Sequence, residues 1–190
     1  MPRTNRFWPC SWRLHAGCLL IICGCSHPVP DSAPLRLGLV SADFSPGGNM
    51  PKSFTCDGGD HSPTLAWKAP PPGTESFALI ADDPDAPLGT WVHWVVFDLP
   101  PDERSLPENF PKNGQTADGS RQGSNDFDKI GYGGPCPPSG KHRYFARLYA
   151  LRQDLDLAPG ARAHEVTMAL DGKVIERAEL LGMFGVSAKG

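Results

Sequence analysis

Acidic and imidazole side chains stand at the ends of three segments that the sequence predicts to be strands. Asp83 and Asp85 follow an apolar stretch directly, and the prolines beside them stiffen the turn from which the carboxylates project. His93 lies inside the most apolar stretch, and His142 opens a third stretch with Tyr144 on the same predicted face. Protonated histidine offers hydrogen-bond donors, and a neighbouring carboxylate orients the ring. The set therefore suits recognition of a phosphoryl group or another small anion.

A turn rich in glycine and proline precedes the third stretch. It reads Gly133-Gly134-Pro135-Cys136-Pro137-Pro138, and its few backbone amides are free to point at an anion. Trp91, Trp94 and the prolines would wall the resulting cavity.

Each of these features also has a purely structural interpretation. A run of acids in a loop is usually a solvated turn, and a single histidine in an apolar strand is more often a core residue with satisfied hydrogen bonds. The combination, more than any one residue, indicates a site.

The elements that must position these residues are predicted to be mostly strands. The chain has 190 residues with 21 glycines and 21 prolines, about double ordinary usage, which favours short strands and long loops over a helical bundle. Apolar runs predict strands over residues 77–81, 91–97 and 142–151. Between the last two lies a segment of 41 residues, 100–140, of which 14 are glycine or proline. Such a segment is either disordered or a functional surface on a rigid scaffold.

The C-terminal part is predicted to hold one helix and a closing strand. Four apolar residues recur at helical spacing, with the weak point Asp171-Gly172 among them: Ala163, Val166, Leu170 and Val174. The run from Ala178 to Phe184 then predicts a strand. Residues 35–186 are expected to form a single domain.

Residues 1–24 have the pattern of a secretory signal peptide. They carry three arginines and no acid, and the apolar run 19–23 is far shorter than the roughly 20 residues that span a bilayer. The sequence Ile22-Cys23-Gly24-Cys25 resembles a bacterial lipobox, in which the final cysteine is lipidated and becomes the N-terminus. A plain signal peptide cut elsewhere, or a cytosolic leader, is the alternative. Residues 25–34 would then be the lipidated Cys25 and a flexible, proline-containing tether.

The lipobox indicates a protein of the bacterial cell envelope that faces the periplasm and is anchored in a membrane through Cys25. No aspartate follows Cys25, which favours the outer membrane over the inner. Cleavage leaves 166 residues and, since it removes three arginines and no acid, changes the net charge from −3 to −6. A mildly acidic chain without a basic stripe is not expected to bind nucleic acid.

Two further thiols, Cys56 and Cys136, remain in the mature chain. In an oxidising envelope they are a natural disulfide pair, and two buried free thiols are the alternative. A bridge would brace the rim of the cavity, because Cys136 precedes His142 in the proline-rich turn.

Taken together, four motifs resemble the signature of the phosphatidylethanolamine-binding proteins (PEBP), and most closely their bacterial Raf-kinase-inhibitor-like branch of YbhB/YbcL type. The motifs occur in the family's order between residues 53 and 184: Asp83-Pro84-Asp85-Ala86-Pro87, Trp91-Val92-His93-Trp94, Gly133-Gly134-Pro135-Cys136-Pro137-Pro138 and His142-Arg143-Tyr144. The resemblance implies a PEBP-like antiparallel β-sandwich with short peripheral helices, one of them near the C-terminus, and an anion pocket at one end.

Carried over residue by residue, the resemblance gives the pocket its members. Asp83, His93 and His142 would line it, and the backbone of Cys136 would replace a glycine amide of the animal members. Around them would lie Asp85, Trp91, Pro138 and Tyr144. The resemblance also implies a cis Ala86-Pro87 peptide. The chain lacks the longer insertion near Leu88-Gly89 and the extended C-terminal helix of the animal members, which leaves the pocket more open and its phospholipid specificity in question.

Three functions are then open. The first is a binding protein for a small anionic or phosphorylated ligand, without turnover, cofactor or metal. The second is an inhibitor of a protease or another enzyme, with a protein as its target. The third is a metal-dependent hydrolase in which two aspartates and two histidines hold zinc or manganese. The sequence has neither HExxH nor GxSxG, so the first function is the expectation.

Overall fold

The computed structural model of the chain describes residues 37–186. The predicted signal peptide, Cys25 and the tether up to residue 34 lie outside the described residues. The elements are, in chain order, η1 (Lys52–Phe54), β1 (Leu65–Ala66), β2 (Ser76–Asp83), β3 (Trp91–Leu99), β4 (Ser105–Leu106), β5 (Arg121–Ser124), β6 (Gly140–Leu151), β7 (Gly160–Arg162), α1 (Ala163–Ala169) and β8 (Val174–Val186).

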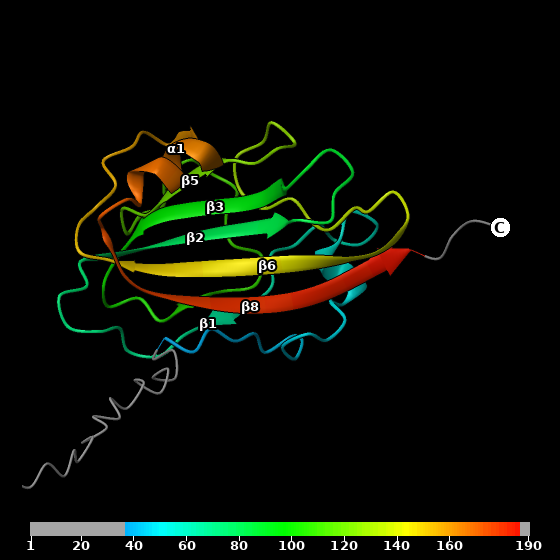
Figure 1. The fold of residues 1–190 in the computed structure, drawn as a ribbon, viewed down its shortest axis with the longest axis horizontal. Helices are drawn as coiled ribbons and strands as arrows, with labels where there is room; N and C mark the ends of the chain where they lie inside the picture. The colour runs from blue at the N-terminus through cyan, green and yellow to red at the C-terminus, as the bar shows by residue number, and fades with distance from the viewer. Residues whose placement is uncertain (1–36, 187–190) are drawn as a thin grey trace, which may run out of the picture. The chain divides into compact units, whose positions relative to one another are not determined.

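Six strands form the main sheet in the order β7-β5-β3-β2-β6-β8, and Figure 1 shows its four long strands side by side. Every neighbouring pair is antiparallel except β5 and β7, which are parallel. A second sheet consists of the antiparallel pair β1 and β4. β2 and β6 are flanked on both sides, so the strands that carry the predicted site belong to the middle of the sheet.

The two faces of the main sheet bury two separate apolar clusters. Strand alternation sends Phe77, Leu79 and Trp94 to one face, where they pack against β1, β4 and neighbouring extended chain. The intervening residues Ile80 and Val95 pack on the other face beneath α1, with the apolar side chains of the helix. The fold is therefore mostly β, with antiparallel sheets and one short helix near the C-terminus, as the sequence predicts.

The long strands and the helix occur where the sequence predicts them. The predicted helix includes Val174, but the observed helix ends at Ala169 and Val174 already begins β8. Gly172 has φ +67°, a left-handed conformation that glycine adopts at little cost, and it turns the chain into the strand.

The segment 100–140, for which disorder was one interpretation, holds β4 and β5 and is pinned to the sheet by a polar core residue. The fully buried Gln122 accepts a hydrogen bond from the indole N–H of Trp94 at 2.9 Å. Its amide nitrogen donates to the backbone carbonyls of Pro111 and Asn113. These bonds satisfy buried polar groups of a loop that has little apolar periodicity of its own.

Between residues 37 and 186, no helix is long and apolar enough to cross a membrane.

Candidate functional site

A cavity of about 270 Å³ lies at the end of the main sheet where β2 ends and where β3 and β6 begin. The structure brings Asp83, His93 and His142 together in its lining, as the sequence predicts. The remaining lining residues are Ala86, Pro87, Leu88, Trp91, Phe127, Cys136, Pro137 and Pro138. The wall is thus mostly apolar, with a few polar groups that converge on it, which is typical of small-ligand sites.

A β-bulge places His93 at this cavity. Ala81 of β2 pairs with Trp94, but the next residue of β2 pairs with Val92, so His93 is the extra residue of the bulge. Regular alternation would put His93 on the face that carries Val95, beneath α1. Instead its ring contacts the ring of Tyr144 edge-on, with the centroids 5.3 Å apart.

The backbone at Gly133 holds the ring of His93 in a fixed tautomer. Nδ1 of His93 lies 2.7 Å from the carbonyl oxygen of Gly133, and the amide of Gly133 donates to the carbonyl of His93 at 2.8 Å. A carbonyl oxygen only accepts, so Nδ1 carries the hydrogen. Burial lowers the pKa of His93, against the opposing effect of the bond to Gly133 and of nearby carboxylates. At neutral pH the ring is therefore neutral, and Nε2 is a hydrogen-bond acceptor.

His142 is oriented by Asp83. Nδ1 of His142 lies 2.7 Å from Oδ2 of Asp83, and both side chains are buried. The other oxygen of Asp83 accepts the backbone N–H of Asp85 at 2.8 Å, which holds the carboxylate and the turn together. The ring of Tyr144 stacks against that of His142 at a centroid distance of 6.4 Å. Nε2 of His142 has no hydrogen-bond partner among the described residues and is left for a ligand.

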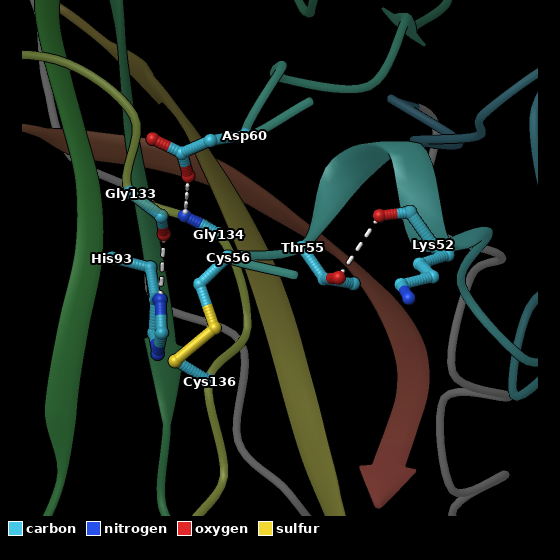
Figure 2. The surroundings of a disulfide bond; sticks show 8 residues. All are labelled: Lys52, Thr55, Cys56, Asp60, His93, Gly133, Gly134 and Cys136. Atoms are coloured by element: carbon cyan, nitrogen blue, oxygen red, sulfur yellow. Dashed lines mark hydrogen bonds between the residues drawn. A yellow bond between two sulfur atoms is a disulfide. The ribbon is translucent and has the colours of Figure 1, made fainter. Parts of the chain in front are cut away.

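A disulfide braces the proline-rich rim, as Figure 2 shows. Cys56 and Cys136 are bonded, with their Cα atoms 5.4 Å apart, so the predicted pairing is confirmed. Oδ1 of Asp60 accepts the amide of Gly134 at 2.6 Å. From Pro135 to Pro138, Cys136 has the single backbone N–H, and this group donates to no other described residue. Cys136 lines the cavity, so this amide is a candidate second donor there.

The two glycines of this rim are required by close approach to neighbouring chain. A Cβ atom on Gly134 would lie 2.4 Å from the carbonyl oxygen of Phe54, and one on Gly133 would lie 2.7 Å from the ring of Phe127. Both distances are shorter than Cβ atoms tolerate, so larger residues would move the rim.

Asp85, which we expected beside the ligand, does not line the cavity. It forms a two-pronged ion pair with Arg143, with Oδ1 at 2.6 Å from Nη2 and Oδ2 at 2.9 Å from Nε. The hydrogen bonds from Arg143 lower the pKa of Asp85 to about 2. Strand alternation explains the difference, because Arg143 occupies the face of β6 opposite to His142 and draws the carboxylate there.

Tyr144 lies behind the two histidines and does not reach the cavity surface. It lines a separate, smaller apolar void of about 40 Å³, and its hydroxyl is buried without a hydrogen-bond partner. Burial and the nearby carboxylate of Asp83 raise the pKa of Tyr144. Its ring packs against the rings of both His93 and His142.

The expectation of a cis Ala86-Pro87 peptide is wrong, because this bond is trans. The amide of Gly89 donates to the carbonyl of Ala86 at 3.1 Å, which closes a four-residue turn. Proline at the second position of such a turn suits a trans bond, whereas a cis proline occupies the third.

Sequence reasoning missed Phe127 and Leu88 as members of the wall. The ring of Phe127 lies edge-on to both Trp91 and His93, at centroid distances of 5.4 Å. Asp126 anchors it through two backbone-directed hydrogen bonds with Val92, a long-range contact that has no sequence signal. Leu88 is 94% exposed at the cavity mouth, and an apolar residue in a turn is not by itself a sign of a site.

Among residues 37–186, no group of three or more histidine, cysteine, aspartate or glutamate residues is arranged so that it could hold a metal ion.

Comparison with known proteins shows similarity to one protein family. The model of the phosphatidylethanolamine-binding proteins matches residues 40–185. A UPF0098 protein of Methanothermobacter thermautotrophicus is 50% identical over 148 residues, which cover 78% of this chain and 98% of that protein. A Mycobacterium tuberculosis protein that carries the name of a lipoprotein, LppC, is 36% identical over 159 residues, 83% of this chain and 75% of that protein.

A solved structure supports the same assignment. The crystal structure of YbcL of E. coli, described as a member of the mammalian PEBP family, is 31% identical. It matches 80% of this chain and 99% of YbcL with a TM-score of 0.75. The chain belongs to the phosphatidylethanolamine-binding protein family.

Proposed function

We propose that the protein binds a small anionic group of phosphoryl type in the cavity of Asp83, His93 and His142, without converting it. The observation that carries the proposal is the arrangement of His142. Its Nδ1 is engaged by a buried carboxylate at 2.7 Å, while Nε2 on the same ring is left for a ligand of the cavity.

The cavity offers two donors to an anion. In its imidazolium form His142 donates from Nε2, and its second N–H stays on Asp83. The unpaired amide of Cys136 is the other donor. Hydrogen bonds from a charged donor are about twice as strong as neutral ones, and the apolar wall strengthens them further by excluding water.

Binding without turnover is favoured by the side chains at the cavity. Its lining within the described part of the chain includes no serine, threonine or free thiol, since the sulfur of Cys136 is in the disulfide. Asp83 is already committed to His142 and to the turn at Asp85. The lining therefore offers no hydroxyl or thiol that a neighbouring base could activate as a nucleophile.

Isothermal titration calorimetry with inorganic phosphate tests the proposal, using protein purified in phosphate-free and sulfate-free buffer. The substitution His142→Gln should weaken phosphate binding at least about tenfold, because a charge-assisted hydrogen bond is lost. The matched control is His164→Gln, an exposed histidine of α1 that is not part of the cavity lining, which should leave the affinity unchanged. Absence of phosphate binding by the wild-type protein would contradict the proposal.

The same proposal places the domain in the bacterial envelope as a lipid-anchored protein facing the periplasm, with the outer membrane favoured. It is supported by the sequence Ile22-Cys23-Gly24-Cys25 and by a relative that carries a lipoprotein name. Cells fed radiolabelled palmitate should label the protein, and Cys25→Ala should abolish the label, because the acyl chains are attached at that residue. Equal labelling of the variant would show that Cys25 is not the anchor.

A further inference from the structure

The two histidines of the cavity differ in the group that holds Nδ1, which is a buried carboxylate for His142 and a neutral backbone carbonyl for His93. Asp83 takes the Nδ1 hydrogen of His142, so that an anion at Nε2 is met by a donor when the ring is protonated. The carbonyl of Gly133 takes the Nδ1 hydrogen of His93, and a neutral ring then has a bare lone pair at Nε2. An anion with only acceptor atoms satisfies the first group and is repelled by the second.

The neutrality of His93 follows from its surroundings. The ring is 4% exposed and is enclosed by the rings of Phe127 and Tyr144. The charged groups that face it are Asp83 on β2 and Asp126 on the loop beside β3, and both favour a protonated ring. Burial outweighs them, and lowers the pKa of His93 below its ordinary value.

We propose that the cavity selects an oxyanion that still carries a proton, and that it takes a phosphomonoester in its singly charged form in preference to a phosphodiester or a sulfate ester of the same charge. The inference rests on the proposed function and names the ligand class of that site. The P–OH group donates to Nε2 of His93, while the other oxygens accept from His142 and from the amide of Cys136.

Three small probes separate these classes without changing the charge. Methyl phosphate keeps one P–OH group and a single negative charge below its second pKa of about 6. Methyl sulfate has nearly the same shape and the same charge, but no proton to donate. Dimethyl phosphate also carries one negative charge and no proton, as the phosphodiester of a lipid headgroup does.

The experiment is calorimetric titration of the wild-type protein with each probe at pH 6, where about half of the methyl phosphate is singly charged. This pH is used because the pKa of His93 lies below its ordinary value of 6.5. Methyl phosphate should bind at least about tenfold more tightly than the other two, because each of these leaves the buried acceptor of His93 unpaired. The contribution of His142 is common to the three and cancels in the ratio of affinities.

A substitution at His93 tests the origin of the preference. In His93→Gln the side-chain amide is able either to donate or to accept, so the ratio between methyl phosphate and methyl sulfate should fall toward one while methyl phosphate still binds. His164→Gln is the matched control and should keep the wild-type ratio. Thermal melting of each variant verifies that it is folded.

The outcomes distinguish this inference from the proposed function. Equal binding of the three probes, or a preference for methyl sulfate or dimethyl phosphate, would overturn the selection of a protonated oxyanion and leave anion binding intact. Binding of none of the three would overturn both. If a folded His93→Gln protein kept the preference for methyl phosphate over methyl sulfate, His93 would not be the group that accepts the P–OH hydrogen.

Discussion

Removal of the disulfide is the perturbation with the largest expected effect on the rim of the cavity. The bridge joins residues 80 apart in the chain, and the chain-entropy model gives a loop of that length about 4.5 kcal/mol of stabilisation. Domains of this size unfold with about 5–15 kcal/mol, so the loss is a substantial fraction of the total. A shift of about 2–4 °C per kcal/mol predicts that the double substitution Cys56→Ser and Cys136→Ser lowers Tm by about 9–18 °C.

The same change should weaken ligand binding below the melting temperature. Cys136 lines the cavity. Without the bridge, the proline-rich turn is held to the preceding segment by the hydrogen bonds of Asp60 to Gly134 and of Cys56 to Pro135. We expect phosphate affinity to fall while circular dichroism still reports a folded sheet. The loosened turn no longer holds the amide of Cys136 in place before binding.

Differential scanning calorimetry with and without dithiothreitol checks the origin of the effect. Reductant should lower Tm of the wild-type protein to that of the double variant and leave the variant unchanged, since it has no bridge to reduce. A double variant that melts within about 2 °C of the wild type, equivalent to no more than about 1 kcal/mol, would refute the reasoning.

Two further predictions concern the surroundings of the cavity. Gly134→Ala should lower the free energy of unfolding by about 1–3 kcal/mol in urea denaturation, because its Cβ would lie 2.4 Å from the carbonyl oxygen of Phe54; an unchanged midpoint would mean that the rim moves freely. Asp85 should titrate near pH 2 by NMR and return toward its ordinary value of 3.8 in Arg143→Met. Because the folded pKa is the lower one, the pair stabilises the fold above pH 3.8 and its contribution is lost as the pH falls toward 2; a normal titration in the wild type would contradict this pairing.

The long strands could be predicted from the sequence, because apolar runs of this length, bounded by turn residues, are typical of buried strands. Residues 77–81 and 142–151 lie within β2 and β6, and the structure extends each by only a few residues. The short strands β1, β4, β5 and β7 were not predicted. They have two to four residues, too few for alternation to show. β5, for example, is held by long-range hydrogen bonds of its own Gln122 with Trp94 of β3 and with Pro111.

Some residues of the site could likewise be predicted from local sequence pattern, and others could not. His142 and Tyr144 share a face because β6 is regular there, so simple alternation predicts their side correctly. Phe127 reaches the cavity through hydrogen bonds between Asp126 and Val92, which join residues 34 apart and follow from the tertiary fold alone.

His93 shows why strand parity by itself would have misplaced the most informative residue of the site. Counting from Val95 puts His93 on the face covered by α1, where an imidazole would be an ordinary core residue. One extra residue between Val92 and Trp94 reverses that assignment and brings the ring to the cavity. Once there, the ring is held by the carbonyl of Gly133, a residue that packs against the ring of Phe127 too closely for a side chain of its own. The position of the Nε2 acceptor of His93 thus depends on two backbone irregularities, a bulge in β3 and a glycine turn. A mutation that removed either irregularity would take this acceptor out of the cavity even though His93 itself is unchanged.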